Sequence, residues 1–540
     1  MPLTFFAFLW DPDSGRAWPR MQGLFITLGL VGTLMAFYQA TQGEAPSALY
    51  LNKNNHAAFL NLLLLPLVAR FVAGSTDGSR FRAASGGVIV LFLTVVFLIG
   101  SRGAFLGFIG GVLFLLWGLG IARWRRHWLL FSALVAIALL LANIGFEPTS
   151  STGARVATLA QPGEAGASRF LIWETSVEML REHPLWGIGL GTFWMMYPAF
   201  RHPDDASGGF FVHNDYLQIW LEAGLPGLLL ILLIGWSLFR SVSAFRQRAG
   251  GNEVEVYGLT AGLAAVGVHS VFTFNLYILS ILILCGLYLG RLHHHCYSTP
   301  TNWRLNLQRI RRKAFVPLLI AGLIPPFGYF LSVTLSQYYL ERADKVTTEN
   351  LGTADRLLGQ AQGLTPALEA IRSARGELWR STLGDLEGER AAEAFKQSVA
   401  AYLEGHRLNG YVPRPLVGLG RLYSEYPQWA DEGNAAEIAE AYFTEAIRLD
   451  PRSLSARRNL AFHQLRQGDT EAALAALEGG LKYRYPPTLN LAGYYSFASQ
   501  LYEEIGKDEQ SIHWHTKAEA ITEKIERKRT RTAPSASMHG

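Results

Sequence analysis

A histidine at position 213 opens the stretch of this sequence whose residue types and spacing could do chemistry. It begins residues 213–227, HNDYLQIWLEAGLPG, which continue directly into an apolar run over residues 228–239. We expect His213 and Asn214 to lie in the first turn of a helix, where unpaired backbone N–H groups and the helix dipole disfavour a protonated imidazole. A neutral imidazole there could accept a proton from a substrate.

The same stretch predicts a break in its helix at the Gly-Leu-Pro-Gly sequence of residues 224–227. Inside a bilayer such a break is tolerated only where protein or a water-filled cavity satisfies the freed backbone groups. The break therefore suggests a cavity beside the histidine. Without further context, a histidine at a helix start is more often a cap or an interface residue, so both interpretations stay open here.

The elements that must position this stretch are membrane helices. Half of the 540 residues are apolar and only 17% are charged, and the apolar residues concentrate in the first 335. Nine runs approach the roughly 20 residues that span a bilayer. They are residues 21–40, 56–72, 86–100, 103–121, 128–144, 225–239, 257–272, 276–289 and 315–335.

Basic residues occur in alternate loops between these runs, which indicates membrane topology and argues against nucleic-acid binding despite a net charge of +5. The positive-inside rule then places the N-terminus in the cytoplasm. Residues 145–212, and everything after residue 335, are placed outside. Only two cysteines occur, so neither a disulfide framework nor a thiolate metal site is expected.

The predicted fold is all-α: a polytopic membrane bundle over residues 21–335, followed by a soluble helical solenoid over residues 336–524. Tetratricopeptide-like repeats are indicated by small and aromatic residues in a 34-residue register, with a plain helical bundle as the alternative. These residues are Ala439, Phe443, Ala446, Ala461, Ala473 and Leu477. Residues 1–20 are expected to be a short N-terminal segment, such as the remainder of a truncated span, and residues 525–540 a disordered basic tail.

Two arginines stand out on the predicted outer side, where positive charge is avoided. Arg102 lies between two spans, and an arginine at membrane depth costs roughly 2.5 to 3.5 kcal/mol. Arg169 begins a helical pattern whose apolar stripe would hold its guanidinium at headgroup height. A pyrophosphate would offset the cost at Arg102, and so would snorkelling to lipid phosphates.

Residues 213–227 resemble the His-Asn, nine residues, Gly-x-x-Gly motif of the O-antigen ligase family, which are bacterial membrane glycosyltransferases. The similarity extends upstream to residues 169–173, 183–193, 101–104 and 54–58. The resemblance implies that Arg102 and Arg169 hold the diphosphate of an undecaprenyl-linked glycan. It also implies that His213 removes or orients the proton of the acceptor hydroxyl.

Further candidates for substrate binding have structural alternatives. Asn214 would orient the substrate or start the helix, and Asn55 and His56 are hydrogen-bonding groups or caps at the outer end of the second span. Arg201 is a third outward arginine, for which a solvated loop position is the stronger interpretation. The glycine-rich residues 183–191 predict a tight turn that packs on the membrane helices.

No metal or other cofactor is expected, because no convincing ligand cluster is present: Asp204 and Asp205 lie in a sequence typical of a loop.

We therefore expect an enzyme of the bacterial inner membrane that transfers a glycan from undecaprenyl diphosphate to a lipid or protein acceptor on the periplasmic face. Its expected partners are these substrates, membrane lipids and a protein bound by periplasmic repeats, with no nucleic acid. An O-antigen polymerase and a protein O-oligosaccharyltransferase are the nearest alternatives. A small-solute transporter and an envelope assembly scaffold are alternatives of other classes.

The predicted topology can be tested with alkaline phosphatase, which is active only outside the cytoplasm. Because the arginine clusters alternate, a fusion after Leu340 should be active and a fusion after Arg126 inactive. Phosphatase activity in intact cells, normalised to fusion abundance, is the measurement. The reverse pattern would contradict both an outward His213 and a periplasmic repeat domain.

Overall fold

The computed structural model describes residues 14–73, 79–144, 164–247, 252–296, 312–346, 350–430 and 433–532. Its regular elements in these ranges are helices, with no strand, which confirms the all-α prediction. The chain forms two compact units, and the first comprises residues Met1–Phe193 and Phe210–Arg309. The second comprises Trp194–Gly209 and Ile310–Gly540. The expected N-terminal segment and outward loop fall partly outside the described residues.

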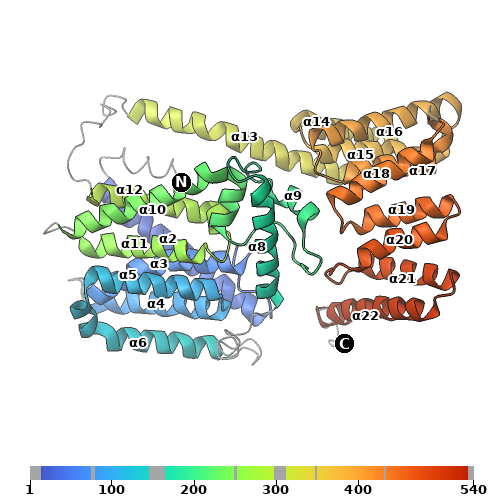
Figure 1. Cartoon of the computed structure of the whole chain (residues 1–540). Coiled ribbons are helices and arrows are strands. Elements are labelled where there is room, and N and C mark those ends of the chain that lie inside the picture. The colour runs from blue at the N-terminus through green and yellow to red at the C-terminus, as the bar shows by residue number, and fades with distance from the viewer. Residues whose placement is uncertain are drawn as a thin grey trace, which may run out of the picture. The chain divides into compact units, whose positions relative to one another are not determined.

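The first unit is a bundle of long apolar helices (Figure 1). Its described elements are α2 (Ser14–Thr41), α3 (Lys53–Ala73), α4 (Ser79–Ile99), α5 (Arg102–Leu119), α6 (Ile121–Asn143), α8 (Glu164–Glu182), α10 (Asp215–Arg246), α11 (Glu253–His269), η2 (Asn275–Tyr277) and α12 (Leu279–Cys296). Among the described residues, six helices are long and apolar enough to cross a membrane: α2 to α6 and α10. The other three predicted spans coincide with α11, α12 and α13 (Arg312–Asp344), so a total of nine crossings stays a prediction.

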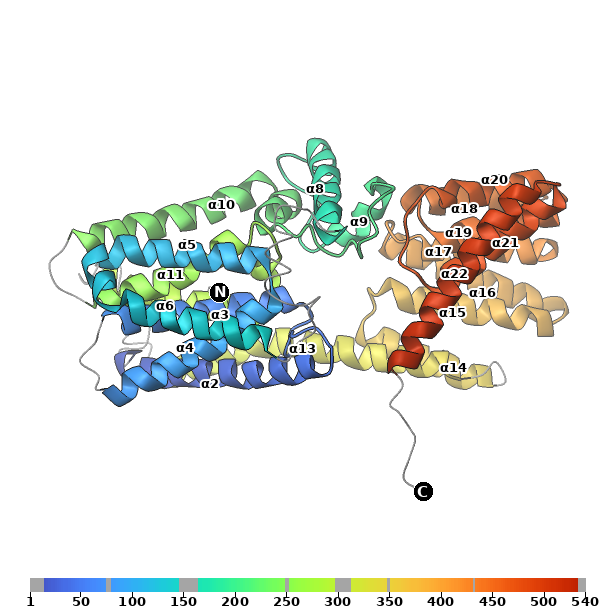
Figure 2. The ribbon, with the colours of Figure 1, turned by 90° about the horizontal axis from the view of Figure 1, so that it is seen from below.

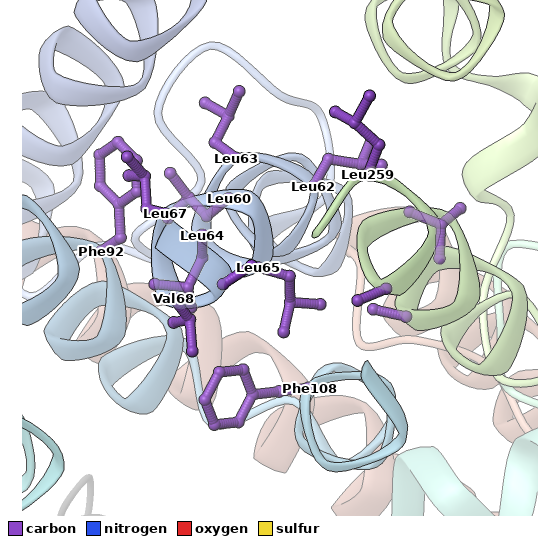
Figure 3. Packing of buried hydrophobic residues seen from close by; sticks show 14 of the residues in the cluster. Leu60, Leu62, Leu63, Leu64, Leu65, Leu67, Val68, Phe92, Phe108 and Leu259 are labelled. Carbon is purple, nitrogen blue, oxygen red and sulfur yellow. The ribbon is translucent and has the colours of Figure 1, made fainter. Parts of the chain in front are cut away.

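Helix α3 is the centre of this bundle. It is apolar on nearly every face, and a helix of that kind is stable only when neighbours surround it. In its most apolar window 83% of residues are buried, against 17% in α2 and in α6. Figure 3 shows leucines of α3 packed against Phe92 of α4, Phe108 of α5 and Leu259 of α11. The outer helices leave apolar side chains exposed, as a lipid-facing surface requires.

The predicted break in α10 is present at Gly224, whose φ of 68° and ψ of −171° are not helical. The turn that precedes α9 (Phe193–Phe200) supplies hydrogen-bond partners at this break. Ile188 N donates to Leu221 O at 2.9 Å, Gly189 N to Glu222 O at 3.0 Å, and Leu225 N to Leu185 O at 3.0 Å. Protein therefore satisfies the freed groups, and the break gives no support for the cavity suggested by the sequence. The turn predicted for residues 183–191 does pack on the membrane helices.

The second unit is a series of antiparallel helix pairs (Figures 1 and 2). Its elements include most of α9 (Phe193–Phe200) and then α13 (Arg312–Asp344), α14 (Leu351–Leu364), α15 (Glu369–Thr382), η4 (Leu383–Asp385), α16 (Gly388–Leu408), α17 (Arg414–Glu425), η5 (Pro427–Trp429), α18 (Ala435–Leu449), α19 (Leu454–Arg466), α20 (Thr470–Leu481), α21 (Leu489–Glu504) and α22 (Asp508–Thr532).

The small and aromatic residues that indicated repeats pack between these helices. Ala439, Phe443 and Ala446 of α18 are fully buried, as are Ala473 and Leu477 of α20. This arrangement confirms the tetratricopeptide-like helical class. Helix α22 continues through residues 525–532, where the sequence predicted a disordered tail, and residues 533–540 lie outside the described part.

The break in α10 generates a stability prediction. A methyl group on Gly224 would lie 2.2 Å from Leu185 O, and its positive φ disfavours any residue with a Cβ by roughly 1 to 2 kcal/mol. Gly224→Ala should therefore lower the thermal midpoint of the detergent-purified protein. Gly235→Ala is the matched control, because a Cβ at Gly235 in the same helix meets nothing within 4 Å. Equal midpoints for the two variants would contradict the packing described here.

Candidate active site

The candidate site lies where several helix ends meet in the first unit. Helices α3, α5 and α10 begin there, α11 ends there, and α8 runs across these ends (Figures 1 and 2). Side-chain and backbone contacts join the ends: Asn55 Nδ2 donates to Asn275 Oδ1 at 3.2 Å, and Asp215 N donates to Ser270 O at 2.8 Å. Helix ends carry unpaired backbone groups, so such a convergence concentrates polar groups at one place.

His213 precedes α10 instead of lying in its first turn, which corrects the prediction from the sequence. Asn214 is the N-cap, and its Oδ1 accepts from Tyr216 N and Leu217 N, both at 3.1 Å. The helix-start role proposed for Asn214 is thus present, while its contact with substrate stays a prediction. His213 has a φ of 60°, which costs a non-glycine residue roughly 1 to 3 kcal/mol and must be held by its surroundings.

Two aromatic rings place the imidazole. The His213 ring meets Phe274 edge-on with centroids 5.3 Å apart, and Phe211 stacks on the same Phe274 at 4.0 Å. The Phe274 carbonyl accepts weakly from Asn55 Nδ2 at 3.5 Å. The imidazole is therefore held against the turn between α11 and α12, which is itself tied to the start of α3.

Asp215 is a residue whose importance the sequence analysis missed. It is fully buried, and its Oδ2 accepts from Leu276 N at 3.1 Å while its own N–H bonds Ser270 O. These two bonds fasten the first residue of α10 to both sides of the turn that carries Phe274. The available signal was an acidic residue directly after the His-Asn pair, a position where carboxylates favour helix starts.

Helix α8 brings the second arginine to this end of the bundle. Trp173 Nε1 donates to Val212 O at 3.0 Å, so α8 is bonded to the residue directly before His213. Arg169 lies one turn earlier on the same helix, and Arg102 is the exposed first residue of α5.

Burial, and then the positive charge of nearby Arg102, lowers the pKa of Arg169. Both guanidinium groups nevertheless stay protonated, because an arginine pKa is far above neutral pH. Two like charges held near each other favour binding of an anion, and guanidinium groups match phosphate oxygens in a bidentate way. The charge of Arg102 thus acts on Arg169. A shared diphosphate site for the two arginines stays a prediction.

Buried polar side chains connect the helix ends that carry these candidate residues. His269 Nε2 lies 3.4 Å from Ser101 Oγ, the side chain that caps α5 directly before Arg102. Asn55 is fully buried on Asn275. His56 is buried too, with its Nδ1 3.4 Å from Pro46 O and its ring stacked on Tyr50 at 5.7 Å. Asn55 and His56 thus hold the bundle end together, and their predicted substrate contacts stay untested.

Arg201 belongs to the second unit, whereas the other candidate residues belong to the first. Its Nε donates to Asp205 Oδ2 at 2.8 Å, and its Nη2 donates to Ser207 Oγ at 3.1 Å. The guanidinium is therefore engaged within its own loop, where the sequence favoured a solvated position. A role for Arg201 in substrate binding stays a prediction.

Comparisons with known proteins cover the part of the chain that contains these residues. The sequence model of the O-antigen ligase family matches residues 87–232, which contain Arg102, Arg169 and His213. A candidate polysaccharide ligase of Rickettsia conorii is 30% identical over 177 residues, covering 30% of this chain and 40% of that protein. A second, from Rickettsia felis, is 28% identical over 187 residues, covering 29% of this chain and 40% of that one.

The family resemblance seen in the motifs is therefore confirmed, and the chain spans about two fifths of the length of these relatives. A crystal structure of a tetratricopeptide protein from Thermus thermophilus covers 36% of this chain and 96% of its own, with 18% identity and a TM-score of 0.27. A TM-score of this size does not define a shared fold, so the description of the second unit rests on its own helix pairs.

Proposed function

We propose that the chain is a membrane glycosyltransferase that moves a glycan from undecaprenyl diphosphate to an acceptor hydroxyl on the periplasmic face of the inner membrane. The observation that carries this proposal is the meeting of Arg102, Arg169 and His213 at one end of an apolar bundle, inside the region that matches the O-antigen ligase family. The polysaccharide ligases among the relatives support glycan transfer of the ligase type.

The reaction is a displacement at the anomeric carbon of the donor sugar. The acceptor oxygen forms a bond to that carbon while the bond from carbon to the diphosphate oxygen breaks. His213 takes the proton that the acceptor hydroxyl loses, and Arg102 and Arg169 stabilise the negative charge that develops on the leaving undecaprenyl diphosphate. The arginines supply the positive charge, so the proposed mechanism needs no metal ion.

An apolar groove suits the lipid part of the proposed donor. It lies between α5 and α6 and is lined by Phe108, Ile109, Val112, Leu113, Phe131, Ser132, Val135, Ala136 and Leu139. Phe108 lies six residues after Arg102, and a helix rises 1.5 Å per residue, so the groove begins about 9 Å along α5 from the arginine. A molecule with a diphosphate head and an isoprenoid chain matches this succession of charged and apolar surface.

The role of His213 is tested by substitution. His213→Ala should reduce turnover by roughly 10² to 10⁴, because the acceptor loses its base, while donor binding changes little. The measurement is transfer by purified enzyme from the host's lipid-linked glycan, together with lipid-linked polymer accumulating in cells.

Two controls separate catalysis from folding in this test. His213→Asn keeps a residue type that tolerates a positive φ but cannot take the proton, so it should be as slow as His213→Ala. His515→Ala removes an exposed histidine of α22 and should leave turnover unchanged. Near-normal turnover of His213→Ala at equal membrane abundance would show that His213 is not the base.

The two arginines should behave differently from the histidine. Arg102→Ala and Arg169→Ala should each weaken donor binding by roughly 1.5 to 3 kcal/mol, which is about 10- to 150-fold, because each removes charge-assisted hydrogen bonds. Lysine should rescue only partly, since it lacks the bidentate fork. The measurement is the Kd of undecaprenyl diphosphate for each variant, with Arg123→Ala on α6 as the control; unchanged Kd values for both variants would contradict the assigned role.

A further inference from the structure

Residues Trp194–Gly209 belong to the second unit, although their neighbours on both sides belong to the first. We call them the inserted segment. The segment contains most of α9 and the turns after it, and peptide bonds join it to Phe193 at one end and Phe210 at the other. A short segment of this kind needs contacts of its own, because ordering its backbone costs conformational entropy.

Inside the segment, the carboxylate of Asp205 is the organising group. It is fully buried and accepts from Tyr197 OH at 2.9 Å, Arg201 Nε at 2.8 Å, Ser207 N at 2.9 Å and Ser207 Oγ at 2.9 Å. Burial alone would raise the pKa of Asp205, but the Ser207 amide and the Arg201 charge outweigh it, so the pKa lies below its ordinary value. A charged Asp205 thus closes the segment on itself.

The repeats hold the segment through turns that share one edge. The turns after α16, α18 and α20 follow the second helix of successive pairs, so stacking places them on the same side of the second unit. Asn409 Nδ2 lies 3.3 Å from Met195 Sδ, Arg452 Nη1 donates to Asp205 O at 2.7 Å, and Arg484 N donates to Pro203 O at 2.9 Å. Each of the three turns supplies one contact.

Arg452 is the central anchor among these contacts. It is only 8% exposed, its second Nη donates to Arg484 O, and its guanidinium lies 5.0 Å from the centre of the Tyr485 ring. Burial and the charge of Arg201 lower the pKa of Arg452, but an arginine remains charged. The Arg452 guanidinium therefore bridges the Asp205 carbonyl of the inserted segment and the Arg484 carbonyl of the next repeat turn.

Both ends of the segment lead directly to the walls of the candidate site. At the first end, the Glu222 carboxylate accepts from Gly191 N at 2.8 Å and Phe193 N at 3.3 Å. At the second end, His213 follows Gly209 by four positions, a separation that an extended chain covers in at most about 14 Å. His213 has the positive φ that must be held from outside. A shift of the segment would therefore pull on the residues that orient the imidazole.

We propose that the repeat domain positions the catalytic histidine, with Arg452 and Asp205 as positioning residues that fix the inserted segment. The inference rests on the proposed function, because it needs His213 to be the base. The repeats then act on the rate of transfer through the chain that they hold.

The test compares Arg452→Met with Arg458→Met in the full-length enzyme. Methionine removes the donors of Arg452 but keeps an apolar stem over Tyr485. Arg458, six residues later in α19, makes an exposed contact to Asn490 and serves as the control. Trypsin cleavage between Arg201 and His202, followed by mass spectrometry, reports release of the segment. We expect faster cleavage and a kcat about 10- to 100-fold lower in Arg452→Met, since small misplacements of a catalytic group have effects of this size.

The KM for the lipid-linked donor should not change, because the arginines that hold the diphosphate lie elsewhere. Asp205→Asn is the second variant, since it opens the segment without touching a repeat helix and should give the same two effects. Faster cleavage with normal kcat, or unchanged cleavage with normal kcat, would overturn the positioning role. Normal turnover of His213→Ala would instead overturn the proposed function and this inference together.

Discussion

A backbone carbonyl or amide inside a bilayer has no water to bond, so every interruption of a membrane helix must be matched by another part of the protein. The first unit satisfies this constraint at Gly224, where the turn of residues 185–189 supplies the missing partners. Side chains do the same at the bundle end, where Asp215 bonds Leu276 N and Glu222 bonds the amides of Gly191 and Phe193. The candidate site is thus built from the same polar groups that satisfy the backbone hydrogen bonds at the helix ends.

The same constraint explains why charge is concentrated at this end. Arg102 and Arg169 lie near enough for their charges to oppose each other, and Arg169 also acts on the buried His269. Two guanidinium groups held near each other repel, and an anion with several oxygens that contacted both would remove that cost in free energy. Under the proposed function, a diphosphate that contacts both groups would relieve that repulsion, and its stabilisation would be greatest when the leaving group carries the most charge.

Local patterns made much of this architecture predictable. The apolar runs, the break at Gly224 and the buried repeat positions such as Phe443 each depend on nearby residues, so their periodicity is visible in the sequence. The functions of Asp215 and Glu222 depend on partners about 30 to 60 residues away, and nothing local separates them from ordinary helix carboxylates. The sequence predicts His213 in the first turn of the helix, whereas it precedes the N-cap, because a positive φ at that position leaves no pattern in side-chain types.

Because the inserted segment belongs to the second unit, the two structural units of this chain are not continuous stretches of sequence. A boundary drawn from hydropathy would divide the chain near residue 335 and treat the two fragments as independent domains. A chain shortened there would lose Arg452, Arg484 and Asn409 together, leaving residues 194–209 without the surface on which they fold. The phenotype of such a truncation would combine the absence of the repeats with damage to an internal loop. Genetic complementation by separately expressed halves would require the second half to recapture a segment encoded in the first.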